Sequence, residues 1–264
     1  MPGLRRGARV SAAPAQSRVL VTGGASGIGA AIVRALAEAG LSVDFTYRAS
    51  AEAAQALLAD LRAAHPDRAF AAHSVDLGDR GALEAFCEIA EAAGYYGLVH
   101  NAGQSCDALA AMLDQERAEA AMQVNFFSFT RLAKSLVREM TRARSGRIVA
   151  IGSVAALRAN AGNAAYAATK GALIAYCRTL AIETAKRGVT VNVIAPGFVD
   201  TAMMERYAAY RDGMERQIPA GRFGRPEDVA ALTAFLMGEG AAYITGTVLP
   251  VDGGLTAMMG VHRS

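Results

Sequence analysis

Short runs of β-branched residues alternate with longer stretches rich in alanine and leucine from residue 18 onward. The short runs have the length of buried strands, and the longer stretches repeat their apolar residues at helical spacing. The expected strands are residues 18–22, 42–47, about 69–75, 97–100, 147–151, 189–195 and 247–251. Strands that alternate with helices form βαβ units and a parallel sheet. The sequence therefore predicts a doubly wound α/β fold with one seven-stranded parallel sheet flanked by helices.

We expect a single domain over residues 18–264. No repeat, low-complexity block or proline-rich linker divides this stretch, and a chain of 264 residues that is 53% hydrophobic can bury one large core. Residues 1–17 are expected to form a flexible N-terminal extension outside the fold, because they lack the apolar stretch of a signal peptide. They contain arginine, alanine and serine but no acid, so a transit peptide is the second interpretation.

Charge and cysteine content exclude several classes of function. The net charge is only +3, and no long basic run is present, so we expect no nucleic-acid partner. No apolar run reaches the ~18 residues of a membrane-spanning helix, so no membrane is expected. The cysteines (Cys87, Cys106, Cys177) match no zinc or disulfide pattern, which favours a reducing cytoplasm. The histidines are scattered as well and indicate neither a metal site nor a catalytic base: His65, His73, His100 and His262.

Glycines crowd the junction between the first strand and the helix after it. The stretch Thr22-Gly-Gly-Ala-Ser-Gly-Ile-Gly29 places Gly23, Gly27 and Gly29 in the pattern Gly-x-x-x-Gly-x-Gly. Such glycines let the backbone approach a pyrophosphate, which then lies at a helix N-terminus. A glycine triplet alone is a weak signal, but its place between a strand and a helix favours a dinucleotide site over an ordinary turn. The spacing differs from that of medium-chain dehydrogenases.

The end of the second strand bears on which dinucleotide is bound. An acidic residue there would accept a hydrogen bond from the adenosine 2′-hydroxyl, whereas an arginine accommodates a 2′-phosphate. Tyr47 stands where the acid is expected, Arg48 follows it, and Asp44 lies too far back along the strand. This pattern favours NADPH over NADH; the alternative is that Arg48 is a solvated strand end.

Tyr166 and Lys170 lie four residues apart in a predicted helix, so they share one face. A nearby ammonium favours the phenolate and would bring the tyrosine pKa from near ~10 towards the working range, so that the phenol can protonate a developing alkoxide. Ser153 ends the strand at 147–151 and would hydrogen-bond the same oxygen. Taken alone, the pair also fits a buried tyrosine beside a surface lysine.

Together these features resemble the short-chain dehydrogenase/reductase superfamily, with its Rossmann-type fold, from residue 18 to about residue 254. The matching pieces are Thr22 to Gly29, Asp76-Leu77, Asn101-Ala102-Gly103, Asn125, Ser153, Tyr166 with Lys170, Pro196-Gly197 and Asp252 to Gly254.

The resemblance implies a catalytic set and a cofactor-binding set. The implied catalytic residues are Asn125, Ser153, Tyr166 and Lys170. The implied cofactor-binding residues are Gly23, Ser26, Gly27, Ile28, Gly29, Arg48, Asp76, Leu77, Asn101, Ala102, Gly103, Tyr166, Lys170, Pro196, Gly197 and Thr201. In the family, the aspartate binds near the adenine, the Asn-Ala-Gly turn steadies the sheet, and the Pro-Gly turn and the threonine adjoin the nicotinamide.

Three further segments carry expectations. Asn125 is a poor residue for a helix interior and indicates a local kink, and the resemblance implies that the carbonyl freed there holds a water that resupplies protons. The helix from about residue 163 to 186 is apolar nearly all round, which favours burial against a copy of itself, as in the family's homotetramers. The methionine-rich segment 200–216 follows the Pro-Gly turn and is expected to be a substrate lid.

The resemblance implies an NADPH-dependent reduction of a ketone to an alcohol. Within the superfamily the chain is most similar to the 3-oxoacyl-[acyl-carrier-protein] reductases of fatty acid biosynthesis, so a 3-oxoacyl thioester is the expected substrate. Reductases of other ketones, sugars or polyketide intermediates share these phrases, and a nucleotide-sensing regulator without catalysis is the alternative from another class. Enoyl reductases match less well, because their tyrosine and lysine lie farther apart.

Acyl carrier protein is a candidate partner. The resemblance implies two basic docking positions near the site mouth. Arg131 occupies one of them, but Ile182 stands at the other, and Arg178 lies one turn earlier. We therefore expect only weak dependence on the carrier.

Overall fold

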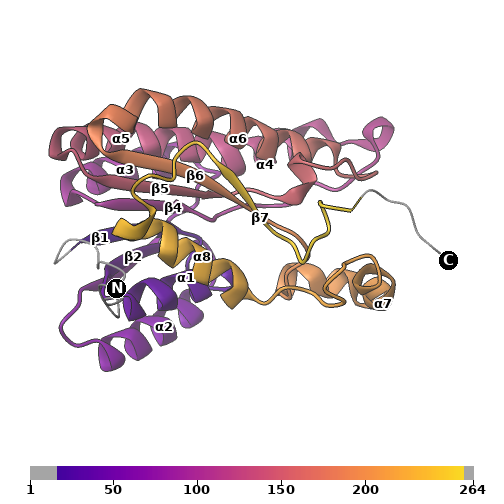
Figure 1. The fold of residues 1–264 in the computed structure, drawn as a ribbon, viewed down its shortest axis with the longest axis horizontal. Coiled ribbons are helices and arrows are strands. Elements are labelled where there is room, and N and C mark those ends of the chain that lie inside the picture. The colour runs from indigo at the N-terminus through magenta and orange to yellow at the C-terminus, as the bar shows by residue number, and fades with distance from the viewer. Residues whose placement is uncertain (1–16, 259–264) are drawn as a thin grey trace, which may run out of the picture.

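The computed structural model describes residues 17–258, which form one parallel sheet between two layers of helices (Figure 1). The strand order is β3-β2-β1-β4-β5-β6-β7, and every neighbouring pair is parallel. The predicted seven-stranded doubly wound α/β fold is confirmed. The expected extension over residues 1–17 lies outside the described residues, except for Ser17.

The strands agree with the predicted runs to within one or two residues. They are β1 (Arg18–Thr22), β2 (Ser42–Tyr47), β3 (Phe70–Ser74), β4 (Gly97–His100), β5 (Gly146–Ile151), β6 (Val189–Pro196) and β7 (Val248–Val251). All residues of β4, β5 and β6 are buried, because helices cover both faces of the sheet.

Two sets of helices cover the sheet. One face carries α3 (Arg80–Ala93), α4 (Gln115–Met122), α5 (Ser128–Ala143) and α6 (Ala164–Thr184). The other carries α1 (Gly27–Glu38), α2 (Ala51–Ala64) and α8 (Pro226–Met237), while α7 (Arg211–Glu215) lies beyond the sheet (Figure 1). Each layer buries its own apolar core against the sheet. Among residues 17–258, no helix is long and apolar enough to cross a membrane.

Two segments depart from regular helix. A π-helical turn, η2 (Gln123–Phe127), separates α4 from α5. The local departure from α-helix expected at Asn125 is this π-helical turn. The segment expected to be a lid contains a 3₁₀ helix, η5 (Ala202–Tyr210), followed by α7. Both departures occur near the carboxyl ends of the strands, where ligands bind in open α/β sheets.

Asp44 is buried within the sheet rather than at the end of β2. Its carboxylate accepts hydrogen bonds from Arg18 and, at 2.6 Å, from the Tyr95 hydroxyl. Burial alone would raise the pKa of Asp44, but hydrogen bonds from His73 and Tyr95 and the charge of Arg18 lower it below its usual value. The carboxylate is therefore a charged structural group, and it points away from the end of the strand.

Candidate active site

A cavity of about 500 Å³ lies at the carboxyl edge of the sheet, across the ends of β1 and β4. The chain leaves these two adjacent strands toward opposite faces, which is the switch point where α/β proteins bind ligands. All sixteen predicted cofactor-binding residues line this cavity, and so does Ser153. Asn125 does not line it and lies fully buried behind it.

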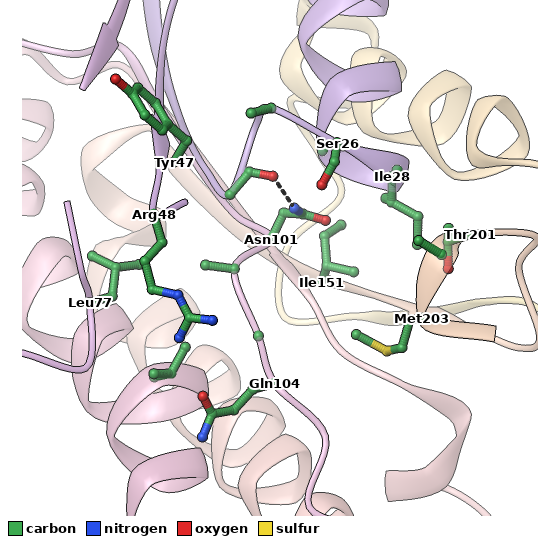
Figure 2. Close-up of a pocket in the computed structure, with 18 of the residues that line it drawn as sticks. Ser26, Ile28, Tyr47, Arg48, Leu77, Asn101, Gln104, Ile151, Thr201 and Met203 are labelled. Atoms are coloured by element: carbon green, nitrogen blue, oxygen red, sulfur yellow. Dashed lines mark hydrogen bonds between the residues drawn. The ribbon is translucent and has the colours of Figure 1, made fainter. Parts of the chain in front are cut away.

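The glycine-rich turn forms one wall and leaves no room for a side chain at Gly29. Gly23 has φ +65°, and a Cβ added at Gly29 would lie 2.0 Å from the carbonyl oxygen of Gly23. The amide of Asn101 donates to the carbonyls of Thr22 (3.2 Å) and Gly23 (3.0 Å), so β4 holds the turn that follows β1 (Figure 2). This tight turn at the start of α1 fits a pyrophosphate.

The end of β2 bounds the other end of the cavity. Figure 2 shows the Arg48 side chain directed toward Leu77 and Gln104, while the ring of Tyr47 points the opposite way. Asp76 is fixed by a 2.8 Å hydrogen bond from the Gly78 amide. Arg48, the Asp76-Leu77 segment, the glycine turn and Thr201 all line the cavity, which suits an extended dinucleotide.

Tyr166, Ser153 and Lys170 meet on the cavity wall. Ser153 caps a 3₁₀ turn, accepting from the Ala155 amide, and its hydroxyl lies close enough to the Tyr166 phenol to lower the pKa of that phenol. Lys170 is 3% exposed; its ammonium donates to the Ile151 carbonyl at 2.8 Å and lies 5.8 Å from the centre of the Tyr166 ring. Helix α6 therefore holds the phenol and the ammonium on one face, as predicted.

The direction of the tyrosine pKa differs from our expectation. Burial raises the pKa of Tyr166, the Ser153 hydrogen bond lowers it, and the nearby Asp107 carboxylate raises it, with a net increase. Burial also lowers the pKa of Lys170 to about 8. Desolvation is the largest of these influences and Lys170 is not among them, so the expected lowering of the pKa by Lys170 was wrong.

Asn125 connects the cavity wall to the catalytic helix. Its side-chain oxygen accepts from the Gln104 amide (2.8 Å), and its NH₂ group donates to the Gln104 carbonyl (3.0 Å) and to the Thr169 hydroxyl (2.9 Å). Thr169 in turn donates to the carbonyl of Tyr166. A Cβ added at Gly103 would lie 3.3 Å from Asn125 Oδ1 and 3.4 Å from Lys170 Nζ, so these groups are tightly packed.

The segment expected to be a lid borders the cavity and makes a contact that the sequence did not indicate. The hydroxyl of Tyr207 donates to Asp107 at 2.9 Å, and Arg206 in the same 3₁₀ helix pairs with Asp107 and hydrogen-bonds Ser105. Met203 and Met204 line the cavity, which fits the expected apolar lid. Within the part of the chain that the structure describes, no three His, Cys, Asp or Glu side chains are grouped as metal ligands would be.

The tight turn yields a first prediction, for Gly29→Ala. The added methyl group would overlap the Gly23 carbonyl, so the turn must move and dinucleotide binding should weaken by at least roughly tenfold, as measured by fluorescence titration with NADPH. Gly171→Ala is the matched control, because a Cβ there meets nothing within 4 Å in helix α6. If Gly29→Ala bound NADPH as the wild type does, this turn would not be the binding site.

Known proteins share both the sequence and the fold. The family model described as enoyl-(acyl carrier protein) reductase matches residues 23–256. The chain is 39% identical to the 3-oxoacyl-[acyl-carrier-protein] reductase FabG of Escherichia coli over 241 residues, covering 89% of this chain and 96% of that protein. It is 37% identical to FabG of Aggregatibacter actinomycetemcomitans over 238 residues, covering 90% and 98%.

Solved structures agree. A short-chain dehydrogenase/reductase from Serratia marcescens is 35% identical, with a TM-score of 0.85 over 92% of this chain and all of that one. A point variant of actinorhodin polyketide ketoreductase, solved with NADPH, is 30% identical, with a TM-score of 0.85 over 92% of this chain and 98% of that one. The chain therefore belongs to the short-chain dehydrogenase/reductase superfamily and is an oxidoreductase that acts on a carbonyl or hydroxyl group.

Proposed function

We propose that the protein is an NADPH-dependent reductase that converts the ketone of a 3-oxoacyl thioester to a secondary alcohol. The observation that carries this proposal is the group formed by Ser153, Tyr166 and Lys170 beside a dinucleotide-sized cavity. The similarity to 3-oxoacyl-[acyl-carrier-protein] reductases supports the substrate class. The spacing of four between tyrosine and lysine favours a ketone over an enoyl substrate.

Tyr166 acts as the general acid in this mechanism. Bound NADPH supplies the hydride. Ser153 orients the ketone oxygen, and Tyr166, whose pKa is raised by burial, holds its proton until that oxygen develops negative charge. Lys170 is charged at neutral pH and stabilises the phenolate that remains. The carbonyl of Asn125, which also accepts from His100, anchors a water that returns a proton.

The cofactor assignment rests on Arg48. Its guanidinium lines the cavity beside Leu77, at the end where a dinucleotide bound on the glycine turn would place its adenosine. β2 ends at Tyr47 and is followed by Arg48, so no acidic residue stands at its tip. Asp44, the acid within this strand, is buried in the sheet. Arg48 therefore binds the 2′-phosphate of NADPH, and the residues assigned to the dinucleotide are the sixteen that line the cavity.

The side chains at the two expected docking positions bear on the binding of an acidic carrier protein. Arg131 is paired with Glu84, and Ile182, which is 81% exposed, carries no charge, so neither position offers an unpaired cation. Reduction of the 3-oxoacyl thioester therefore depends only weakly on the carrier.

Exposed apolar residues of α6 and η2, including Ile182 and Phe127, support assembly into a homotetramer. The three buried free cysteines suit reducing cytoplasm.

A direct assay separates the rival functions. Oxidation of NADPH is followed with an acetoacetyl thioester beside a panel of small ketones and sugars. The proposal expects the thioester to have the highest kcat/KM. Preference for a ketone from the panel would support the broader ketone reductase, and tight NADPH binding with no turnover of any compound would support a nucleotide-sensing regulator.

Removing the Tyr166 hydroxyl tests the general acid. Tyr166→Phe should lower kcat by about 10²–10⁴-fold while leaving the Kd for NADPH nearly unchanged, because the hydroxyl is needed for proton transfer whereas the other fifteen residues assigned to the dinucleotide are kept. Tyr176→Phe makes the same change ten residues farther along α6, away from the cavity, and should retain activity. A Tyr166→Phe enzyme with half of the wild-type kcat would remove this mechanism.

The pH dependence of kcat tests the charge on Lys170. Burial lowers its pKa to about 8, so the ammonium is present below that pH and is lost above it. Reduction should therefore be fastest below pH about 8 and should slow as the pH rises through that value. A kcat that increases through this range, measured under NADPH saturation, would contradict a role for the ammonium.

Substitution of Arg48 tests cofactor preference. Arg48→Ala should raise KM for NADPH and leave KM for NADH little changed, since only NADPH carries the 2′-phosphate. Arg34→Ala is the control, because it removes an arginine of α1 that pairs with Asp60 outside the cavity. Equal effects of Arg48→Ala on both cofactors would make Arg48 a solvated strand end.

A further inference from the structure

His100 ends β4 and is completely buried between the cofactor turn and the π-helical turn. Its Nδ1 lies 3.1 Å from the hydroxyl oxygen of Thr22, and its Nε2 lies 3.3 Å from the carbonyl oxygen of Asn125. The ring packs against Phe129, with centroids 5.2 Å apart. The imidazole therefore contacts both Thr22, which precedes the glycine turn, and Asn125 of the π-helical turn, but it does not line the cavity.

The partners fix which nitrogen carries the proton. A carbonyl oxygen only accepts, so Nε2 of His100 must donate to Asn125. In a neutral imidazole Nδ1 then accepts, and the Thr22 hydroxyl donates to it. The same hydroxyl oxygen accepts from the amides of Asn101 (3.1 Å) and Ala102 (3.0 Å), so each group in this chain of hydrogen bonds has a consistent role.

The chain of hydrogen bonds reaches the catalytic helix at its other end. The carbonyl of Asn125 belongs to the π-helical turn, and the side chain of the same residue bonds Thr169, which bonds the carbonyl of Tyr166. Lys170 follows Thr169 directly. A displacement of the Asn125 backbone would therefore move the groups that position Tyr166 and Lys170.

The imidazole also keeps this region free of a second positive charge. Burial and the charge of Lys170 lower the pKa of His100 to about 3, against hydrogen bonds to the carbonyls of Val124 and Asn125. A lysine or arginine at this place would add a cation beside Lys170. A neutral imidazole donates to the Asn125 carbonyl and accepts from the Thr22 hydroxyl without adding a positive charge.

We propose that His100 is a positioning residue, which locks the carbonyl of Asn125 to the cofactor turn through Thr22 and so sets the placement of Tyr166 and Lys170 relative to the bound cofactor. Its kinetic consequence rests on the proposed reductase function. Its hydrogen-bonding pattern does not, so the two can fail separately.

The first test needs no substrate. In protein labelled with ¹⁵N-histidine, ring nitrogen shifts and couplings report the tautomer, and His100→Gln assigns the signal by its loss. We expect His100 to be neutral with the proton on Nε2 and to keep these shifts from about pH 5 to about pH 8, where solvent-exposed histidines titrate. A proton on Nδ1, or a signal that titrates in this range, would overturn the proposal.

The second test is kinetic. His100→Phe keeps a buried ring but loses both hydrogen bonds, and should lower kcat roughly tenfold or more while KM for NADPH changes less than about twofold. His100→Gln retains an amide that can donate to the Asn125 carbonyl and should recover part of this loss. His65→Phe, which removes an imidazole far from the cavity, should leave kcat unchanged.

The split between the variants separates positioning from simple stability. If His100→Phe lowered the melting temperature but left kcat intact, or if His100→Gln were no better than His100→Phe, the positioning role would be wrong. Should His100→Phe fail to fold, the tautomer of the wild-type ring still decides. If the wild type reduces no ketone, the tautomer result stands by itself and the failure belongs to the proposed function.

Discussion

The structure depends on the contact between the ends of β1 and β4. These adjacent parallel strands send the chain to opposite faces of the sheet, so their carboxyl ends are left open to form the cavity. The Thr22 hydroxyl accepts from the backbone amides of the two residues after β4, and the Asn101 side chain donates to the carbonyls of Thr22, the last residue of β1, and of Gly23. These reciprocal bonds fix the shape of the glycine turn before any ligand binds, which reduces the entropy lost on binding.

Burial sets the electrostatics of the site. Desolvation raises the pKa of Tyr166 and lowers that of Lys170, so both shifts favour the neutral forms. At neutral pH the phenol therefore keeps its proton beside a charged ammonium, and the two groups do not form an ion pair. The lid adds a third influence, because Asp107 lies near Tyr166 and its carboxylate is paired with Arg206. The segment 200–216 thus bears on the acidity of the phenol through the Arg206–Asp107 pair.

Much of this architecture could be predicted from the sequence, because its signals are local. Strand limits followed from β-branched runs, and the glycine turn and the spacing of Tyr166 and Lys170 need only a few adjacent residues. The contacts that were missed are long-range. Asp107 and Arg206 are 99 residues apart, and the imidazole of His100 acts on partners from separate elements. The direction of the Tyr166 pKa shift could not be predicted either, because it depends on how deeply the folded chain buries the phenol and on which charged groups lie near it.

The most direct test of the account compares two substrates that differ only in the reacting group. Acetoacetyl and crotonyl thioesters of one carrier molecule are offered with NADPH deuterated at the transferred position, and the products are analysed by mass spectrometry and NMR. The account predicts rapid reduction of the acetoacetyl compound, with deuterium on the new carbinol carbon, and little reaction of the crotonyl compound. Preferred reduction of the crotonyl double bond would contradict it, because the tyrosine and lysine would then serve an enoyl reductase.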